Sequence, residues 1–379
     1  SQPLALDVAP TADDTVVADV IKALESCKKP AIYAGGGVIL SNASDELTKL
    51  AELLDAPVCC SLMGMGSISA NHPLFAGNLG MHGAVETGMA IKNADLIIAA
   101  GARFSDRVAG DTEKFGANAT IIHLDIDEKE INKNVKVDKW LIGNLKESLN
   151  ALNSKLSQQN HSDWKNELSS FTTETEKKIG DYITPQEIIR ELEAIRKDTD
   201  IVVTDVGQHQ MWAAQYYKYT QPRTLLSSGG LGTMGYGLGA CIGAKMGQRD
   251  KICINIAGDG CFRMNMNELA TASRYNIPII QVVINNHVLG MVRQWQNLFY
   301  GRRFSATDPH RATDFSAAAK AFGFEGFAVT KTEDIKPALE KAMSLNGPVL
   351  IDFCISPDSN VLPMIPPGKD VDDMILELD

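Results

Sequence analysis

Short apolar runs alternate along the chain with longer stretches in which apolar residues recur at helical spacing. Helices are predicted in such stretches, for example at 43–55 and 184–195. The apolar runs predict strands at 30–37, 57–62, 95–101, 120–127, 200–207, 252–260, 277–286 and 348–355. Strands that alternate with helices are typical of a parallel sheet with helices on both faces. The pattern therefore predicts an α/β fold.

The eight predicted strands form two series separated by a polar segment. Residues 151–182 carry many charged and polar side chains and no strand pattern, which predicts a helical linker. A chain of 379 residues also exceeds the length that one hydrophobic core usually supports. We predict two doubly wound parallel-sheet domains at 1–150 and 183–360, the linker at 151–182 and a C-terminal tail at 361–379.

Composition narrows the class of protein. The chain has 36 basic and 47 acidic residues, a net charge of −11, which argues against a nucleic acid or an anionic membrane as partner. Its seven cysteines form no CxxC pair, which predicts reduced thiols and a cytoplasmic location. The sequence contains no apolar run of the roughly 18 residues that a membrane span needs.

Polar residues follow two consecutive strands of the second series. Gly258, Asp259 and Gly260 end one strand, and Asn286 ends the next, 27 positions after Asp259. Parallel strands bring such ends to one edge of the sheet, where carboxylate, amide and main-chain oxygens suit Mg²⁺. The glycines let backbone N–H groups approach phosphate oxygens. Each motif alone is more simply a turn or a loop, but together they predict a site for a diphosphate and a metal.

This pair of motifs resembles the signature of thiamin-diphosphate enzymes. Longer stretches resemble one branch, the acetohydroxyacid (acetolactate) synthase family, in order from about Lys29 onwards: LGMHG, GARFSDRV, GGLGTMGYG, NNHVLGMVRQWQNLFYG and VLPMIPPGK. The resemblance implies that Asp259, Asn286 and the main-chain oxygen of Val288 hold Mg²⁺. It implies thiamin-diphosphate contacts from Gly207, Gln208, His209, Gly232, Met234, Gly258, Asp259, Gly260, Cys261, Phe262, Asn286, Val288, Leu289, Gly290 and Met291. A histidine in a surface loop is the alternative interpretation of His209.

The same resemblance implies residues for substrate recognition. Trp295 matches a tryptophan that narrows the acceptor pocket in favour of a longer 2-ketoacid, and Met291 and Val292 match pocket-lining positions. Arg107 matches an arginine that binds the carboxylate of the acceptor, a task that suits guanidinium geometry. Each has an ordinary alternative: a tryptophan on a helix usually fills a core, and Arg107 could pair with Asp106.

The first domain resembles the flavin-binding domain of the family, although it has no GxGxxG motif. Ser105 and Asn144 stand where the family often has aspartate. Asp125, at a strand end, is placed to accept a hydrogen bond from a ribose hydroxyl. The resemblance implies FAD contacts from Gly35, Gly36, Gly37, Ser61, Leu62, Met63, Gly80, Met81, His82, Gly101, Ala102, Arg103, Arg107, Val108, Asp125, Ile126, Gly143 and Asn144.

The resemblance also implies an activity and partners. The family decarboxylates pyruvate and condenses it with a second 2-ketoacid, which gives 2-acetolactate or 2-aceto-2-hydroxybutyrate at the first step of branched-chain amino acid biosynthesis. It implies a homodimer or higher homo-oligomer and a regulatory small subunit.

The family's activating glutamate lies in an N-terminal pyrimidine-binding domain that has no match in this sequence. We therefore expect a large subunit without that domain, and one that is inactive alone. The alternatives are another thiamin-diphosphate-dependent decarboxylase or carboligase, such as a flavin-free one, and a non-catalytic cofactor-binding fragment.

Overall fold

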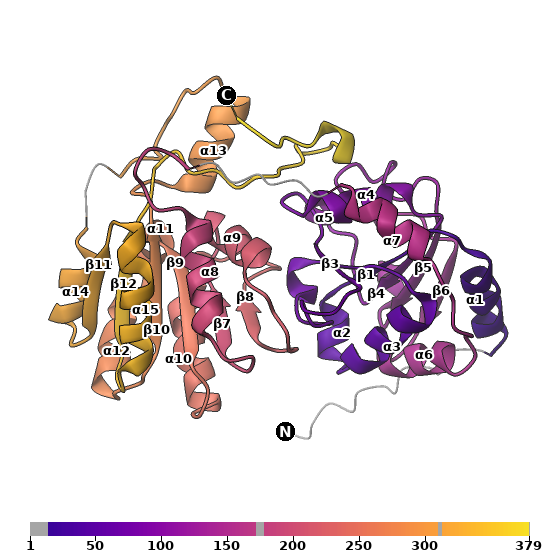
Figure 1. Ribbon diagram of the computed structural model, residues 1–379, viewed down its shortest axis with the longest axis horizontal. Coiled ribbons are helices and arrows are strands. Elements are labelled where there is room, and N and C mark those ends of the chain that lie inside the picture. Colours follow the sequence, from indigo (N-terminus) through magenta and orange to yellow (C-terminus); the bar gives the residue numbers. More distant parts are fainter. Residues whose placement is uncertain (1–13, 172–177, 310–312, 379) are drawn as a thin grey trace. The chain divides into compact units, whose positions relative to one another are not determined.

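The computed structural model describes residues 14–171, 178–309 and 313–378 and divides the chain into two compact units (Figure 1). Unit 1 comprises Ser1–Thr175 and Pro363–Asp379, and unit 2 comprises Glu176–Leu362. The start of the predicted first domain, 1–13, and part of the predicted linker, 172–177, lie outside the described residues. Of the predicted C-terminal tail, 361–379, residues 363–379 belong with unit 1, and residues 361 and 362 belong with unit 2.

Unit 1 is built on a six-stranded parallel sheet in the order β3-β2-β1-β4-β5-β6. Its strands are β1 (Pro30–Ala34), β2 (Val58–Cys60), β3 (Phe75–Asn78), β4 (Leu96–Ala100), β5 (Thr120–Asp125) and β6 (Lys139–Ile142). Its helices are α1 (Asp14–Ser26), α2 (Gly36–Leu40), α3 (Ser44–Leu54), α4 (Val85–Asn93), α5 (Asp106–Ala109), α6 (Leu145–Asn153) and α7 (Ser162–Ser169).

A helix inside the predicted linker, α7, packs onto the core of unit 1. Every residue of β1 and β4 is buried, because helices cover both faces of the sheet. Trp164, on α7, is also buried, and its indole N–H donates to the main-chain oxygen of Pro30 at 2.9 Å. The polar sequence around α7 thus surrounds one apolar anchor that packs the helix onto unit 1.

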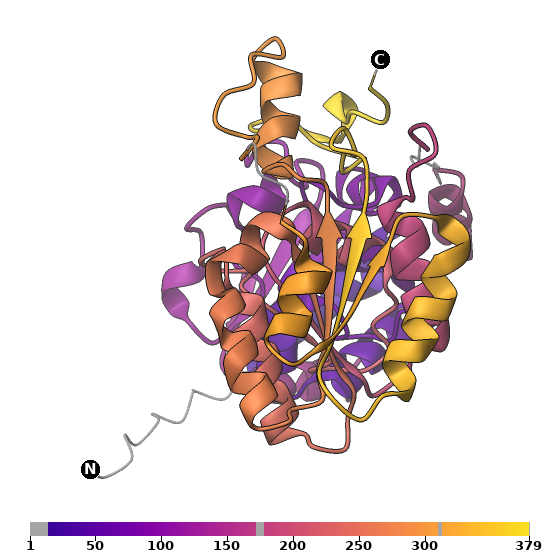
Figure 2. The ribbon, with the colours of Figure 1, turned by 90° about the vertical axis from the view of Figure 1, so that its left-hand side faces the viewer.

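Unit 2 repeats the architecture, with a six-stranded parallel sheet in the order β11-β12-β10-β9-β7-β8. Figure 2 shows helices on both sides of its strands. The strands are β7 (Ile201–Thr204), β8 (Leu225–Ser227), β9 (Cys253–Gly258), β10 (Ile280–Asn285), β11 (Glu325–Val329) and β12 (Val349–Cys354). The helices are α8 (Pro185–Ile195), α9 (Gln208–Tyr216), α10 (Tyr236–Gly247), α11 (Asp259–Asn265), α12 (Leu269–Arg274), α13 (Gly290–Phe299), α14 (Phe315–Ala321) and α15 (Ile335–Ser344).

The structure confirms the predicted fold class, two α/β units with parallel sheets. Each of the eight predicted strands is present, and each observed strand is shorter than its predicted range. The start of α8 shows how local sequence sets an element: Thr184 and Glu187 form a reciprocal capping box before the helix. Among the described residues, no helix is long and apolar enough to cross a membrane.

Candidate functional site

The predicted thiamin-diphosphate residues gather at the carboxyl ends of the strands in unit 2. The chain runs from β7 to the outer strand β8 and then returns to β9 on the other side of β7, so the topological switch lies between β7 and β9. Ligands of open parallel sheets bind in the crevice outside such a switch. The segment after β7 leads through Gly207 into α9, and β9 ends at Gly258, immediately before Asp259. The GDG motif and the switch point therefore coincide.

The predicted metal ligands lie at the ends of neighbouring strands. Ile284 pairs with Gly258 in the register of β9 and β10, which brings Asp259 and Asn286 to the same edge. Both side chains are buried, and the Asn286 Oδ1 accepts a hydrogen bond from the N–H of Val288 at 3.2 Å. A carboxylate, an amide and a main-chain carbonyl are thus available as a set of hard oxygen donors.

The electrostatics of Asp259 fit a cation. Burial raises the pKa of its carboxyl, against the opposing effect of the Arg263 guanidinium 3.9 Å away. A positive ion beside such a carboxyl would favour its ionised form. Within the described ranges, no group of three or more His, Cys, Asp or Glu side chains could hold a metal. A metal at this edge would therefore depend on the amide and main-chain oxygens beside Asp259.

His209 lies buried against the GDG motif. A Cβ placed on Gly258 would come within 2.9 Å of the His209 Nδ1, so glycine is required for this close approach. Burial lowers the pKa of His209 to about 4, although Asp205 opposes the shift, and the ring is neutral at pH 7. The His209 Nε2 is buried and has no hydrogen-bond partner among the residues described. An unsatisfied nitrogen at this position fits a site that a polar ligand completes.

Apolar side chains are exposed beside this polar edge. A Cβ on Gly260 would come within 2.8 Å of the Leu289 Cδ2 and within 3.7 Å of the Met234 Cε, so these three residues lie together. Met234 and Leu289 are each 37% exposed. Of the other predicted contacts, Cys261 and Phe262 are buried, whereas Gly232 is exposed.

Two buried residues that the sequence analysis did not select hold this edge together. The Asp205 carboxylate accepts hydrogen bonds from the N–H groups of Gly235 at 2.9 Å and Gly237 at 3.1 Å, which ties the glycine-rich loop to the end of β7. Gln294, on α13, accepts from the side chain of Gln208 at 2.9 Å. The acidic residue directly after a strand was a usable signal for Asp205, but nothing in the local sequence distinguishes Gln294.

The predicted substrate residues of unit 2 lie on α13, which stands beyond the carboxyl ends of the strands in Figures 1 and 2. Gln294 is its only buried residue. Trp295 and Met291 are partly buried, and Val292 is 49% exposed. The Trp295 ring contacts Phe299 edge-on, with 5.4 Å between centroids. Trp295 therefore does not fill a core of unit 2 and leaves part of its aromatic surface exposed.

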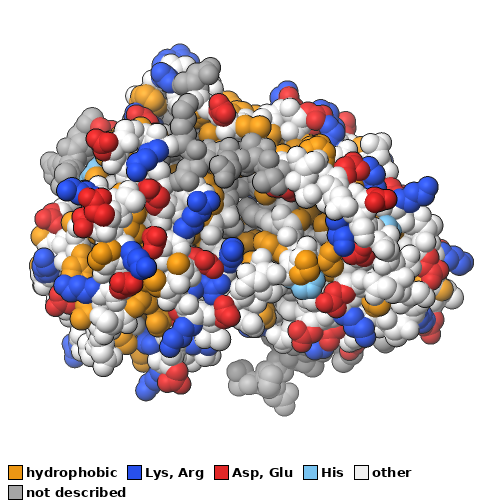
Figure 3. All heavy atoms as spheres, in the orientation of Figure 1, with side chains coloured by type: hydrophobic (Ala, Val, Ile, Leu, Met, Phe, Trp, Pro, Cys, Tyr) orange, Lys and Arg blue, Asp and Glu red, His pale blue; other side chains and the backbone are white. Residues whose placement is uncertain are grey.

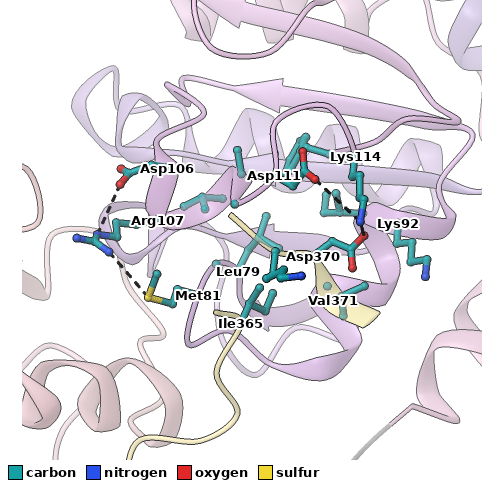
Figure 4. A pocket seen from close by; sticks show the side chains of 18 of the residues that line it. Leu79, Met81, Lys92, Asp106, Arg107, Asp111, Lys114, Ile365, Asp370 and Val371 are labelled. Carbon is teal, nitrogen blue, oxygen red and sulfur yellow. Dashed lines mark hydrogen bonds and ion pairs between the residues drawn. The ribbon is translucent and has the colours of Figure 1, made fainter. Parts of the chain in front are cut away.

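Arg107, in unit 1, lines a cavity of about 220 Å³ (Figure 4). Its side chain is 65% exposed. The guanidinium lies 3.8 Å from the Asp106 carboxylate, the alternative partner, and 4.0 Å from the Met81 sulfur. The Met81 N–H donates to the Arg107 carbonyl at 2.8 Å, and the Ile365 N–H donates to the Met81 carbonyl at 2.7 Å. The C-terminal tail therefore bonds to Met81, which in turn bonds to the main chain of Arg107 on α5. The guanidinium stays accessible to a carboxylate.

The predicted flavin residues surround the switch point of the first sheet, between β1 and β4. Asp125, at the end of β5, accepts from the N–H of Asp127 at 3.0 Å and lies 3.5 Å from the buried His123 ring. Burial alone would raise the pKa of its carboxyl, but these contacts outweigh burial and lower the pKa. Two large apolar side chains at this edge are exposed, Met63 at 42% and Ile126 at 66%. Further predicted contacts lie in the segments that follow these strands: Gly36, Ser61, Leu62, Ala102, Arg103 and Gly143.

Some predicted flavin residues have structural tasks of their own. A Cβ on Gly37 would come within 2.6 Å of the Gly101 Cα, and Gly35 would collide with the Gly101 carbonyl, so these glycines permit two loops to touch. A Cβ on Gly80 would meet the Arg107 carbonyl at 2.7 Å. Asn144 caps α6, because its Oδ1 accepts from the N–H of Lys146 at 2.9 Å. His82 is buried, and Val108 is partly buried beside the cavity.

Comparisons with known proteins agree with both units. Residues 17–152 match the central domain of thiamine pyrophosphate enzymes, and residues 205–353 match their C-terminal TPP binding domain. Thiamine pyrophosphate is thiamin diphosphate under another name. The chain belongs to the thiamine pyrophosphate enzyme family, as the resemblance in the sequence implied.

Within this family the chain is similar to large subunits of acetolactate synthase. It is 44% identical to a probable acetolactate synthase large subunit of Methanococcus aeolicus over 376 residues, which cover 94% of this chain and 62% of the relative. It is 41% identical to the acetolactate synthase large subunit of Corynebacterium glutamicum over 372 residues, 94% of this chain and 59% of that protein. The chain thus spans less than two thirds of the length of these relatives.

Charged side chains of both signs lie on the surface. Acidic and basic side chains are interspersed on the face shown in Figure 3, and no large area there carries one sign. Nucleic-acid-binding surfaces concentrate positive charge.

Proposed function

We propose that the protein is a thiamin-diphosphate-dependent carboligase that decarboxylates pyruvate and joins the remaining two-carbon unit to a second 2-ketoacid. The products are 2-acetolactate from pyruvate and 2-aceto-2-hydroxybutyrate from 2-ketobutyrate, at the first step of branched-chain amino acid biosynthesis. The observation that carries the proposal is the GDG motif at the switch point of unit 2, with Asn286 at the same edge. The relatives named acetolactate synthase support the choice of reaction.

The residues of unit 2 fit the diphosphate and its metal. Asp259, Asn286 and the Val288 carbonyl would hold Mg²⁺, and His209 would meet the diphosphate with its unsatisfied nitrogen. Met234 would support the apolar part of the cofactor. When bound, thiamin diphosphate supplies a nucleophilic carbon and an electron sink. The protein then has to hold it, exclude water and orient the ketoacids.

Substrate recognition falls to two accessible side chains. Arg107 would bind the carboxylate of the acceptor ketoacid, because its side chain is exposed and its ion pair with Asp106 is long, at 3.8 Å. Trp295 would narrow the acceptor pocket with its partly exposed ring, so that an ethyl group fills space that a methyl group leaves empty. Met291 and Val292, on the same helix, would line this pocket.

FAD is the proposed ligand of unit 1. The support is the switch point between β1 and β4, the glycine-containing loops there and the exposed apolar side chains of Met63 and Ile126. Asp125 would accept from a ribose hydroxyl. The carboligation has no net redox change, so the flavin would serve structure.

The assembly and location are proposed on the same basis. The relatives are named large subunits, which supports a partner small subunit of regulatory function and a homodimer or larger homo-oligomer. All seven cysteines are free thiols, and at least four of them are fully buried. Reduced thiols favour a cytoplasmic location.

The test of function is a product assay on the full-length protein. Supplied with thiamin diphosphate, Mg²⁺ and an equimolar mixture of pyruvate and 2-ketobutyrate, it should form both acetohydroxyacids and release CO₂. Acetaldehyde as the main product would assign the protein to the decarboxylases instead. The absorbance spectrum of the purified protein tests the flavin separately, because flavin bands survive denaturation and extraction.

A further inference from the structure

A continuous row of buried side-chain amides connects Asn286 to Ser359 and to Val361, the first residue of the predicted C-terminal tail. The Asn286 Nδ2 donates to the Gln208 Oε1 at 3.1 Å. The Gln208 Nε2 donates to the Gln294 Oε1 at 2.9 Å and to the Ser359 carbonyl at 2.9 Å. The Gln294 Nε2 donates to the Val361 carbonyl at 3.0 Å, and its Oε1 accepts from the Val361 N–H at 2.9 Å. The three amide side chains are at least 95% buried.

The main-chain groups at one end of the row set its direction. A carbonyl can only accept and a backbone N–H can only donate, so Val361 determines which end of the Gln294 amide is oxygen. The Gln294 oxygen and the Ser359 carbonyl then both require the NH₂ group of Gln208. The Gln208 oxygen therefore points toward Asn286, whose NH₂ group donates to it.

The consequence falls on the other end of the Asn286 amide. With Nδ2 held by Gln208, Oδ1 accepts from the Val288 N–H, at the edge of the sheet where Asp259 follows β9. A reversed amide would present N–H groups to a cation and would oppose two oxygens at Gln208. Steric fit also matters here, because a side chain on Gly290 would collide with both Gln208 and Asn286.

We propose that Gln294 is a positioning residue for the metal site: through Gln208 it orients the Asn286 amide so that its oxygen, and not its NH₂ group, faces the metal. This inference rests on the proposed function, in which Asn286 is a metal ligand. Outer partners of this kind orient direct ligands, and their loss usually costs about 10- to 100-fold in metal affinity.

The same helix offers a matched control. Gln296, two residues further on, makes a similar pair of bonds to a loop: its Nε2 donates to the Ser305 carbonyl at 3.0 Å, and its Oε1 accepts from the Ser305 N–H at 3.0 Å. No bond links Gln296 to Asn286 in the described part of the chain. Gln294→Met and Gln296→Met therefore each remove one amide clamp, and only the first interrupts the row.

The experiment measures Mn²⁺ affinity by electron paramagnetic resonance in the full-length protein with saturating thiamin diphosphate. We expect Gln294→Met to weaken Mn²⁺ binding about 10- to 100-fold and Gln296→Met to leave it within about twofold of the parent. Thermal midpoints of the metal-free proteins establish that both fold. Gln294→Ser, too short to reach Gln208, replaces the methionine variant if that protein does not fold.

A conservative exchange separates hydrogen-bond direction from packing. Gln294→Glu presents an oxygen to Gln208 whether its carboxyl is ionised or neutral, so Mn²⁺ affinity should stay well above that of Gln294→Met. Equal affinity in Gln294→Met and Gln296→Met would overturn the inference while the proposed function stands, and so would a glutamate variant as weak as the methionine variant. A parent protein that binds no Mn²⁺ with thiamin diphosphate would overturn both.

Discussion

A side chain on Gly290 has no room beside Gln208: a Cβ there would collide with the Gln208 Oε1 and with the Asn286 Nδ2 that bonds to it. Gly290→Ala should therefore separate this pair and destabilise unit 2 by about 1–3 kcal/mol, the usual cost of overpacking. Gly239→Ala is the control, because nothing lies within 4 Å of a Cβ at that position on α10. There, alanine should stabilise the helix by about 0.5–1 kcal/mol. Urea unfolding of both variants checks the opposite signs.

Removing the buried carboxylate of Asp259 should abolish cofactor binding without lowering the stability of the metal-free protein. Asp259→Ala should abolish Mg²⁺-dependent binding of thiamin diphosphate, because the exchange removes the only carboxylate among the proposed ligands. Without metal the variant should unfold no more easily than the parent, since burial raises the pKa of Asp259 and so penalises its charge. Titration with thiamin diphosphate at saturating Mg²⁺, followed by tryptophan fluorescence, measures the first effect and thermal unfolding the second.

The exposed Asp250 supplies the control for that experiment. Asp250→Ala changes the net charge by the same amount and should leave the titration unchanged. Retained affinity in Asp259→Ala would remove this carboxylate from the metal site.

The shape of the acceptor pocket should depend on Trp295. Trp295→Leu, assayed in the full-length protein, should lower the preference for 2-ketobutyrate over pyruvate by about tenfold or more, the usual scale for one methylene in an apolar pocket. Competition between the two ketoacids, with both products quantified, gives the ratio directly. Trp140→Leu, at a partly exposed tryptophan of unit 1, should leave the ratio unchanged. An unaltered ratio in Trp295→Leu would exclude the tryptophan from acceptor selection.

One buried acid should make the stability of unit 2 depend on pH. Burial raises the pKa of Asp352 to about 6, and the hydrogen bond from the Asn285 Nδ2 at 3.0 Å opposes this shift. The unfolded chain loses this proton near pH 4. Between about pH 4 and 6 the folded protein therefore holds one more proton than the unfolded protein, and stability falls as pH rises.

Asparagine at position 352 removes that titration and keeps an oxygen for Asn285. Relative to the parent, the free energy of unfolding of Asp352→Asn should rise by about 2 kcal/mol from pH 4.5 to pH 7. This follows from the difference of about two pKa units between folded and unfolded Asp352. Free energies of unfolding at both pH values test this. If the free energies of unfolding of the two proteins differ by the same amount at pH 4.5 and pH 7, Asp352 does not titrate between these pH values.

The sequence predicted the central strands of both sheets and none of the edge strands. β1, β4, β9 and β10 are buried on both faces, so their sequences are continuous apolar runs. The four missed strands, β3, β6, β8 and β11, lie at the edges, where exposed and buried positions mix and the apolar run is lost. An edge strand is defined by its neighbour's hydrogen bonds, which local sequence does not contain.

By itself the sequence determined the α/β class, the parallel sheets, the family and the motif pair of Asp259 and Asn286, because each follows from local patterning or from short motifs on consecutive strands. Only the tertiary structure decided how the proposed ligands are held. Gln294 acts on Asn286 through Gln208, 86 positions earlier in the chain, and on Val361, 67 positions later. The direction of a buried amide depends on which distant main-chain group it meets, and that is settled only when the sheet brings these segments together.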